Sequence, residues 1–124
     1  MAQARLALRA VQLAFWAALV FTFVAAVMPA RQAPQLFPWD KAEHFAAFYT
    51  LTVLGVAAFP RRSMALLALL LSAFGAFIEL VQALPIVNRD ADFRDWVTDS
   101  IAVGAALLPL ALIRWRMFFG ATEG

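Results

Sequence analysis

Four long apolar segments, separated by short polar or proline-rich stretches, set the pattern of this chain. They cover about residues 10–28, 39–59, 64–84 and 96–113. Each is close to the ~20 residues that an α-helix needs to span a bilayer. A helix satisfies its own backbone hydrogen bonds in lipid, whereas an isolated strand does not. The pattern therefore predicts an all-α integral membrane protein, folded as a bundle of four transmembrane helices.

The composition favours the same class. Of the 124 residues, 65% are hydrophobic and 15% are charged, which leaves too little polar surface for a soluble domain. The chain has no cysteine, so disulfides and thiol chemistry are excluded. No basic stripe with interleaved aromatic residues indicates nucleic acid as a partner. We expect a single membrane domain over residues 1–124.

The first apolar segment has two interpretations. Arg5 and Arg9 precede it, as basic residues precede the core of a cleaved signal peptide. However, the apolar run exceeds the ~7–15 residues of such a core, and Met28-Pro29-Ala30 is a poor cleavage site. A transmembrane helix over about residues 10–28 is therefore the favoured prediction.

The basic residues predict the orientation of the bundle. With four spans, the N-terminus, the turn at residues 60–62 and the C-terminus share one side of the membrane. That side holds six arginines, namely Arg5, Arg9, Arg61, Arg62, Arg114 and Arg116. Cytoplasmic segments carry an excess of lysine and arginine. Both termini are therefore predicted to be cytoplasmic.

Polar residues within the apolar segments concentrate toward the opposite side. Glu79 lies near the end of the third segment, and His44 and Asp99 lie near the starts of the second and fourth. At 1.5 Å per residue, these three residues are about 6–9 Å from their helix ends. Small residues on the same helix faces allow the backbones to approach closely. We expect one polar layer that opens to the outer side.

Some of these residues also have structural interpretations. Asp40 with Glu43 has the spacing of a helix-capping pair, and so does Asp92 with Asp95. Arg89 and Arg94 are expected to pair with the neighbouring aspartates more readily than with a substrate.

Glu79, Gln82 and Asp99 lie inside helices, where capping does not explain them. An interhelical polar lock contributes only about 0.6 kcal/mol per hydrogen bond, and an ionisable residue in a membrane span indicates function by default. We therefore favour a functional role for Glu79 and name Glu79 and His44 as the candidate catalytic residues. His44 is the only histidine, and zinc usually takes several nitrogen or sulfur ligands. No metal and no cofactor are expected.

Taken together, the polar residues resemble a known family. Asp40-Lys41-x-x-His44-Phe45, Glu79-x-x-Gln82 and Arg89-x-x-Asp92-x-x-Asp95, followed by a small-residue helix, resemble the VanZ-like family of bacterial membrane proteins. The resemblance covers about residues 39–112, a VanZ-like core preceded by the helix at 10–28. It implies a polar binding site made of Asp40, Lys41, His44, Glu79, Gln82, Arg89, Asp92 and Asp95. The chain has Asp99 where the family often has asparagine, so we add Asp99 as a further member of that site.

The resemblance implies a multi-pass protein of the bacterial cytoplasmic (inner) membrane. VanZ itself is an accessory protein that raises resistance to teicoplanin, a lipid-bearing glycopeptide. We therefore expect an outward-facing polar pocket whose partner is a membrane lipid or another envelope-linked small molecule. Two alternatives stay open. One is a membrane-embedded enzyme that acts on a lipid-linked substrate by carboxylate and histidine acid–base chemistry, and the other is a purely structural polar lock.

Overall fold

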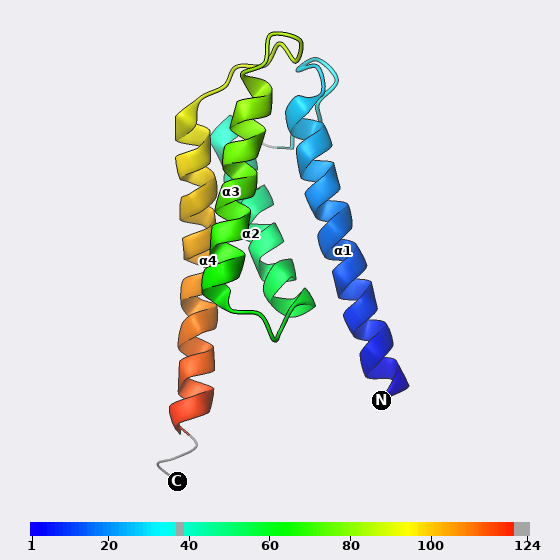
Figure 1. Ribbon diagram of the computed structural model, residues 1–124, viewed down its shortest axis with the longest axis vertical. Helices are drawn as coiled ribbons and strands as arrows, with labels where there is room; N and C mark the ends of the chain where they lie inside the picture. Colours follow the sequence, from blue (N-terminus) through cyan, green and yellow to red (C-terminus); the bar gives the residue numbers. More distant parts are fainter. Residues whose placement is uncertain (37–38, 121–124) are drawn as a thin grey trace.

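The computed structural model describes residues 1–36 and 39–120. This part of the chain forms four α-helices, which are α1 (Ala2–Val27), α2 (Asp40–Ala58), α3 (Met64–Gln82) and α4 (Phe93–Phe119). Helices α1 and α3 run in one direction and α2 and α4 in the other, so α1 starts where α4 ends (Figure 1). The predicted all-helical fold is confirmed.

The first and last helices are longer than the apolar segments that predicted them. Helix α1 begins at Ala2 rather than near residue 10, and α4 covers Phe93–Phe119 rather than 96–113. Alanine, leucine and arginine are strong helix formers, so each helix continues into the arginine-bearing flank of its segment. Pro109 lies inside α4, as membrane helices tolerate.

Three of the helices are long and apolar enough to cross a membrane. Over an apolar stretch of 18 residues in each helix, the mean hydropathy is 2.1 in α1, 2.3 in α3 and 1.8 in α4. Helix α2, whose first turn carries Asp40, Lys41 and Glu43, is not among them. Many large apolar side chains point outward; Leu69 and Leu80, for example, are 67% and 70% exposed. These are the features of a membrane protein, because hydrocarbon accepts an apolar surface that water does not.

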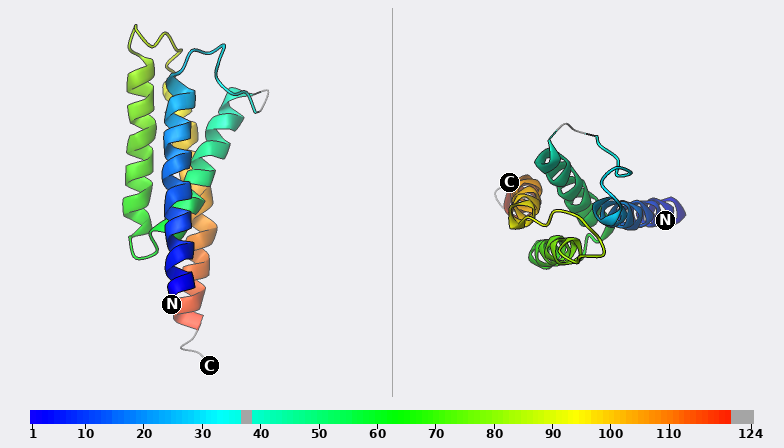
Figure 2. Two further views of the ribbon diagram at one scale, coloured as in Figure 1. Left: turned by 90° about the vertical axis from the view of Figure 1, so that its right-hand side faces the viewer. Right: turned by 90° about the horizontal axis from the view of Figure 1, so that it is seen from above.

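The packing leaves α1 at the side of the bundle. Helices α1 and α4 each pack against α2 and α3. Within the described residues, α1 and α4 make no contact with each other. Seen from above, α1 lies on the side away from α4 (Figure 2). The helices share one apolar core, made of Phe15, Phe48, Leu51, Ala58, Leu71, Ile78, Ala102 and Val103.

The helix starts are stabilised in different ways. The Ser63 hydroxyl accepts a hydrogen bond from the Leu66 N–H at 3.0 Å, which caps α3. The predicted cap at Asp40 is wrong: Trp39 is the N-cap residue of α2, and its side chain makes no capping hydrogen bond. Asp40 lies one position too far into the helix, and its carboxylate is directed elsewhere.

Charge is segregated along the bundle. The start of α1, the α2–α3 turn and the end of α4 form one end, where the six arginines named above lie. Arg114 there donates a hydrogen bond to the Pro60 carbonyl at 3.3 Å. The other end, called here the acidic end, carries four basic residues and seven acidic ones, the latter being Asp40, Glu43, Glu79, Asp90, Asp92, Asp95 and Asp99.

Candidate functional site

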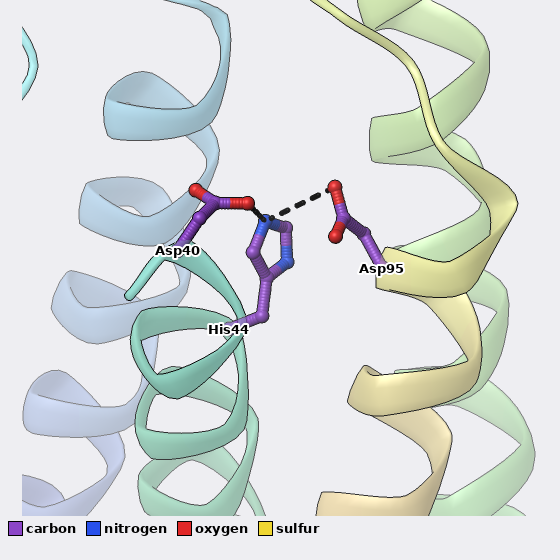
Figure 3. A group of neighbouring side chains, drawn as sticks. All are labelled: Asp40, His44 and Asp95. Carbon is purple, nitrogen blue, oxygen red and sulfur yellow. Dashed lines mark ion pairs between the residues drawn. The ribbon is translucent and has the colours of Figure 1, made fainter. Parts of the chain in front are cut away.

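His44 is the centre of a polar cluster between α2 and α4 at the acidic end. Its Nδ1 lies 3.0 Å from Oδ1 of Asp99, which is fully buried. Its Nε2 lies 3.7 Å from Oδ2 of Asp40 and 3.6 Å from Oδ2 of Asp95 (Figure 3). Asp40 and His44 are four residues apart on α2, and Asp95 and Asp99 are four apart on α4, so each pair shares one helix face.

Lys41 completes this cluster on its exposed side. Its Nζ donates a hydrogen bond to Oδ1 of Asp95 at 3.0 Å and lies 3.7 Å from Oδ2 of Asp92. Asp92 is the N-cap of α4, and its side chain accepts from the Arg94 N–H at 3.0 Å. This hydrogen bond is the main reason why the pKa of Asp92 is below its ordinary value. The positive charges of Lys41 and Arg94 lower the pKa further. The predicted capping role of Asp92 is confirmed, whereas the Asp95 carboxylate is used for side-chain contacts.

Glu79 of α3 forms a hydrogen bond with the start of α4. Its Oε2 accepts a hydrogen bond from the Asp92 backbone N–H at 2.9 Å. Glu79 and His44 were both expected in one polar layer, but no hydrogen bond joins them in the described residues, where His44 is bonded to Asp99. The other oxygen of Glu79, Oε1, is buried with no hydrogen-bond partner among the described residues. Glu79 therefore has a structural role that its position in an apolar run did not reveal.

Gln82 and Arg89 donate hydrogen bonds to backbone carbonyls at the end of α1. Gln82 Nε2 donates to the Ala26 carbonyl at 2.9 Å, and Arg89 Nη1 donates to the Met28 carbonyl at 2.6 Å. Asn88 has φ 53°, a left-handed conformation that asparagine adopts more readily than most residues. The predicted pairing of Arg89 with neighbouring aspartates is wrong in the described residues. A helix end offers unpaired carbonyls and partial negative charge, which Arg89 satisfies instead.

Loss of the Arg89 side chain is expected to loosen α1. Arg89→Met should lower the free energy of unfolding by about 2 kcal/mol, because a charged donor to backbone carbonyls is lost. Spin labels on cysteines introduced at Ala30 and Ile86 should show a broader distance distribution, and the cysteine-free chain allows this labelling. Arg94→Met, which removes an exposed arginine of the same region, is the control. Equal distributions in the two variants would contradict the role of Arg89.

Small residues allow α3 and α4 to pack closely against each other. An added Cβ on Gly75 would lie 2.9 Å from Oδ2 of Asp99, so only glycine leaves room for that carboxylate. One turn away, the hydroxyls of Ser72 and Ser100 are 3.0 Å apart, and the Trp96 indole donates to the Ser72 carbonyl at 3.0 Å. On α4, Asp95, Asp99, Ala102 and Ala106 recur at steps of three and four residues, and all four are buried. Gly104 of the same helix is exposed, and an added Cβ there would meet nothing within 4 Å.

A pocket of about 330 Å³ lies beside the His44 cluster, between α1, α2 and α3. One part of its wall is apolar and comes from both α1 and α2, with Ala25 and Ala47 as examples. The other part is polar and includes His44, Gln82 and Arg89. The residues that line it are Ala18, Phe21, Thr22, Ala25, Ala26, Ala33, Pro34, Leu36, Asp40, Glu43, His44, Ala46, Ala47, Phe48, Thr50, Ile78, Gln82 and Arg89.

The structure divides the predicted site residues into groups. Asp40, Lys41, His44, Asp92, Asp95 and Asp99 form the cluster described above. Glu79, Gln82 and Arg89 bond mainly to the backbone. Sequence reasoning missed the α1 wall of the pocket, because alanines in an apolar segment give no signal of a binding surface.

The chain was compared with family models, with curated proteins and with solved structures. No family model, no curated protein and no solved structure matches it. What can be said of its family and function therefore depends on its own residues and their geometry.

Proposed function

We propose that this chain is a multi-pass protein of the bacterial cytoplasmic membrane that binds an amphipathic molecule of the cell envelope. The ligand is a lipid or a lipid-bearing glycopeptide, held in the pocket between α1, α2 and α3. The observation that carries this proposal is the composition of the pocket wall, which combines many apolar side chains of α1 and α2 with polar ones such as His44, Gln82 and Arg89. Binding sites of this kind combine an apolar surface with a few placed polar groups.

The two parts of the wall suit the two parts of such a ligand. An acyl chain fits against Ala18 and Ala25 of α1 and Ala47 of α2, where small side chains leave space. A polar headgroup fits near Arg89, which supplies hydrogen-bond donors, and near His44, which supplies an acceptor. Phe21 of α1 and Thr50 of α2 line the pocket and are both exposed. On this basis, the proposed route of entry for a lipid runs from the bilayer between these two helices.

The proposal includes four membrane crossings with both termini in the cytoplasm. The segregation of six arginines at one end supports this orientation by the positive-inside rule. Helix α2 is proposed to cross with the others, because its charged first turn is paired with α4 through Lys41–Asp95 and His44–Asp99. Paired polar groups that face a bundle interior are the ones that membranes tolerate.

The resemblance to the VanZ-like family adds a biological setting to this proposal. An accessory role like that of VanZ in teicoplanin resistance would require recognition of a molecule with a lipid tail and a polar body. The pocket offers an apolar surface and hydrogen-bonding groups side by side, which is what such a molecule requires.

Filling the apolar part of the pocket is expected to prevent ligand binding. Ala25→Trp places a large ring in the pocket wall, and it should reduce photo-crosslinking of the ligand about tenfold or more, which corresponds to about 1.4 kcal/mol. The probes are a photoactivatable phospholipid and a photoactivatable lipid-bearing glycopeptide, each added to the full chain in nanodiscs. Preferential labelling by one probe identifies which of the two ligand classes is bound.

The matched control is Ala17→Trp, which adds the same ring to the exposed face of the same helix. Labelling of this variant should equal that of the unmodified chain. Labelled peptides should come from the pocket-lining parts of α1 and α2. Equal labelling of Ala25→Trp and Ala17→Trp by both probes would contradict the proposed function.

A second candidate function is favoured by one contact. The hydrogen bond between Asp99 and His44 orients the imidazole of a residue that lines the pocket, as in sites that use histidine as a general base. In that case the chain would be an enzyme acting on a lipid-linked substrate. Formation of a new product from envelope lipid extract would distinguish this activity from binding alone.

A further inference from the structure

Three potential metal ligands converge at the acidic end of the bundle. They are Asp40 and His44 from α2 and Asp95 from α4, and one ligand atom of each lies within 4.8 Å of the other two (Figure 3). We infer that these three side chains bind a divalent first-row transition-metal ion, such as Zn²⁺ or Mn²⁺. This site goes beyond the proposed lipid-binding function, which does not require a metal.

The distances fit a metal site better than a set of hydrogen bonds. Nε2 of His44 is 3.7 Å from Asp40 Oδ2 and 3.6 Å from Asp95 Oδ2, which is too long for a hydrogen bond. A tetrahedral ion with bonds of ~2.1 Å separates its ligand atoms by about 3.4 Å. The two distances from His44 Nε2 lie close to this value. The ligand oxygens of Asp40 and Asp95 lie within 4.8 Å of each other, so they need to approach by at most about 1.4 Å (4.8 − 3.4 Å) to share one ion with His44.

In His44 and Asp95, the polar atom that does not face the common centre already has a partner. His44 Nδ1 is bonded to Asp99 Oδ1 at 3.0 Å, and Asp95 Oδ1 accepts from Lys41 Nζ at 3.0 Å. An ionised carboxylate only accepts hydrogen bonds, so Asp99 places the ring proton on Nδ1 and leaves the lone pair on Nε2. A histidine that binds a metal through one nitrogen usually donates from the other to such a carboxylate.

The charge of the cluster also favours a cation. Its carboxylates belong to Asp40, Asp92, Asp95 and Asp99, and its basic groups belong to Lys41 and His44. Arg94, whose charge acts on Asp92, is a third basic group. With all four carboxylates ionised and His44 neutral, its lone pair on Nε2, two negative charges remain. Negative charge at a partly buried site is costly unless it is paired or coordinates a metal. A divalent ion would balance it.

The ligand types define the kind of ion. One imidazole nitrogen with two carboxylate oxygens suits zinc or manganese, whereas magnesium and calcium prefer oxygen ligands alone. Three protein ligands leave at least one coordination position for water or for a ligand oxygen. Asp40 and His44 also line the pocket. If the proposed lipid-binding function holds, an anionic headgroup could occupy that position.

The experiment measures binding of Zn²⁺ alone, and separately of Mn²⁺ alone, to the EDTA-treated full chain in nanodiscs by calorimetry. We expect one ion per chain. Asp40→Asn and His44→Ala should each weaken binding about tenfold or more, and Asp99→Asn should weaken it about 10- to 100-fold through the His44 ring. Asp90→Asn removes an exposed acid near the same end of the bundle, and it should bind as the unmodified chain does.

Two measurements keep these results interpretable. Asp40 has a side chain that is 63% exposed, so Asp40→Asn is expected to keep its helix content in circular dichroism even if His44→Ala does not. Lipid crosslinking of the EDTA-treated chain reports on the pocket without metal, which separates failure of the metal site from failure of the lipid-binding function. Lack of binding by the unmodified chain, or equal binding by the Asp40→Asn and Asp90→Asn variants, would overturn the inference.

Discussion

His44→Ala is expected to lower the free energy of unfolding by about 3 kcal/mol, because it leaves the fully buried carboxylate of Asp99 without its partner. Removal of one member of a buried pair costs more than the pair contributes, since the remaining charge keeps its desolvation penalty. The measurement is unfolding of the chain in mixed micelles by a denaturing detergent, followed by circular dichroism.

A second variant separates the effect of the Asp99 charge on stability from the effect of losing the imidazole. Adding Asp99→Asn to the His44→Ala variant should restore part of the lost stability, because asparagine carries no charge that needs a partner. Adding Asp90→Asn to the same variant is the control, and it should restore nothing because Asp90 is exposed. If Asp99→Asn fails to restore stability, the buried charge is not the cause of the loss.

Gly75→Ala is expected to destabilise the bundle by about 2 kcal/mol, as overpacking of a close contact does. The added Cβ would lie 2.9 Å from Oδ2 and 3.3 Å from Cβ of Asp99. The side chain of Asp99 is short, buried and bonded to His44, so it has little room to move. The α3–α4 contact and the His44–Asp99 hydrogen bond should therefore both be strained.

Gly104→Ala is the matched control for this variant. It is the same substitution within another helix that is long and apolar enough to cross a membrane, but the added Cβ meets nothing within 4 Å. Alanine in a helix interior is more stable than glycine by about 0.5–1 kcal/mol, so this variant should be slightly stabilised. Detergent-induced unfolding of the two variants in parallel gives the comparison. A stable Gly75→Ala variant would show that α3 and α4 are less closely packed than described.

The fold could be predicted from the sequence largely because helix length and polarity follow from local composition. The apolar segments located four helices, and the 1.5 Å rise per residue placed Glu79, His44 and Asp99 toward the same end. The small faces of α3 and α4 were also predicted, because small residues at three- and four-residue steps lie on one face. These inferences depend on each helix alone, which is why a single sequence was sufficient for them.

The pairing of side chains could not be predicted in the same way. The depth of a residue along the bundle does not determine which helices are neighbours or how each helix is rotated about its axis. From the sequence, His44 could therefore face Glu79 as well as Asp99. The partners of Gln82 and Arg89 are backbone carbonyls of α1, and backbone acceptors have no signature in the sequence. The loop conformation that directs Arg89 to them depends on the left-handed Asn88, which no periodicity reveals.

The segregation of charge along the bundle has an energetic consequence in a living cell. One end carries six arginines, and the acidic end has three more acidic than basic residues. Moving one elementary charge through a membrane potential costs or gains about 2.3 kcal/mol per 100 mV. If the chain crosses the membrane as proposed, a membrane potential that is negative inside favours the orientation that places the arginines in the cytoplasm. The same potential would then draw cations from outside into the partly buried acidic end, where the carboxylates of Asp40 and Asp95 lie close to His44.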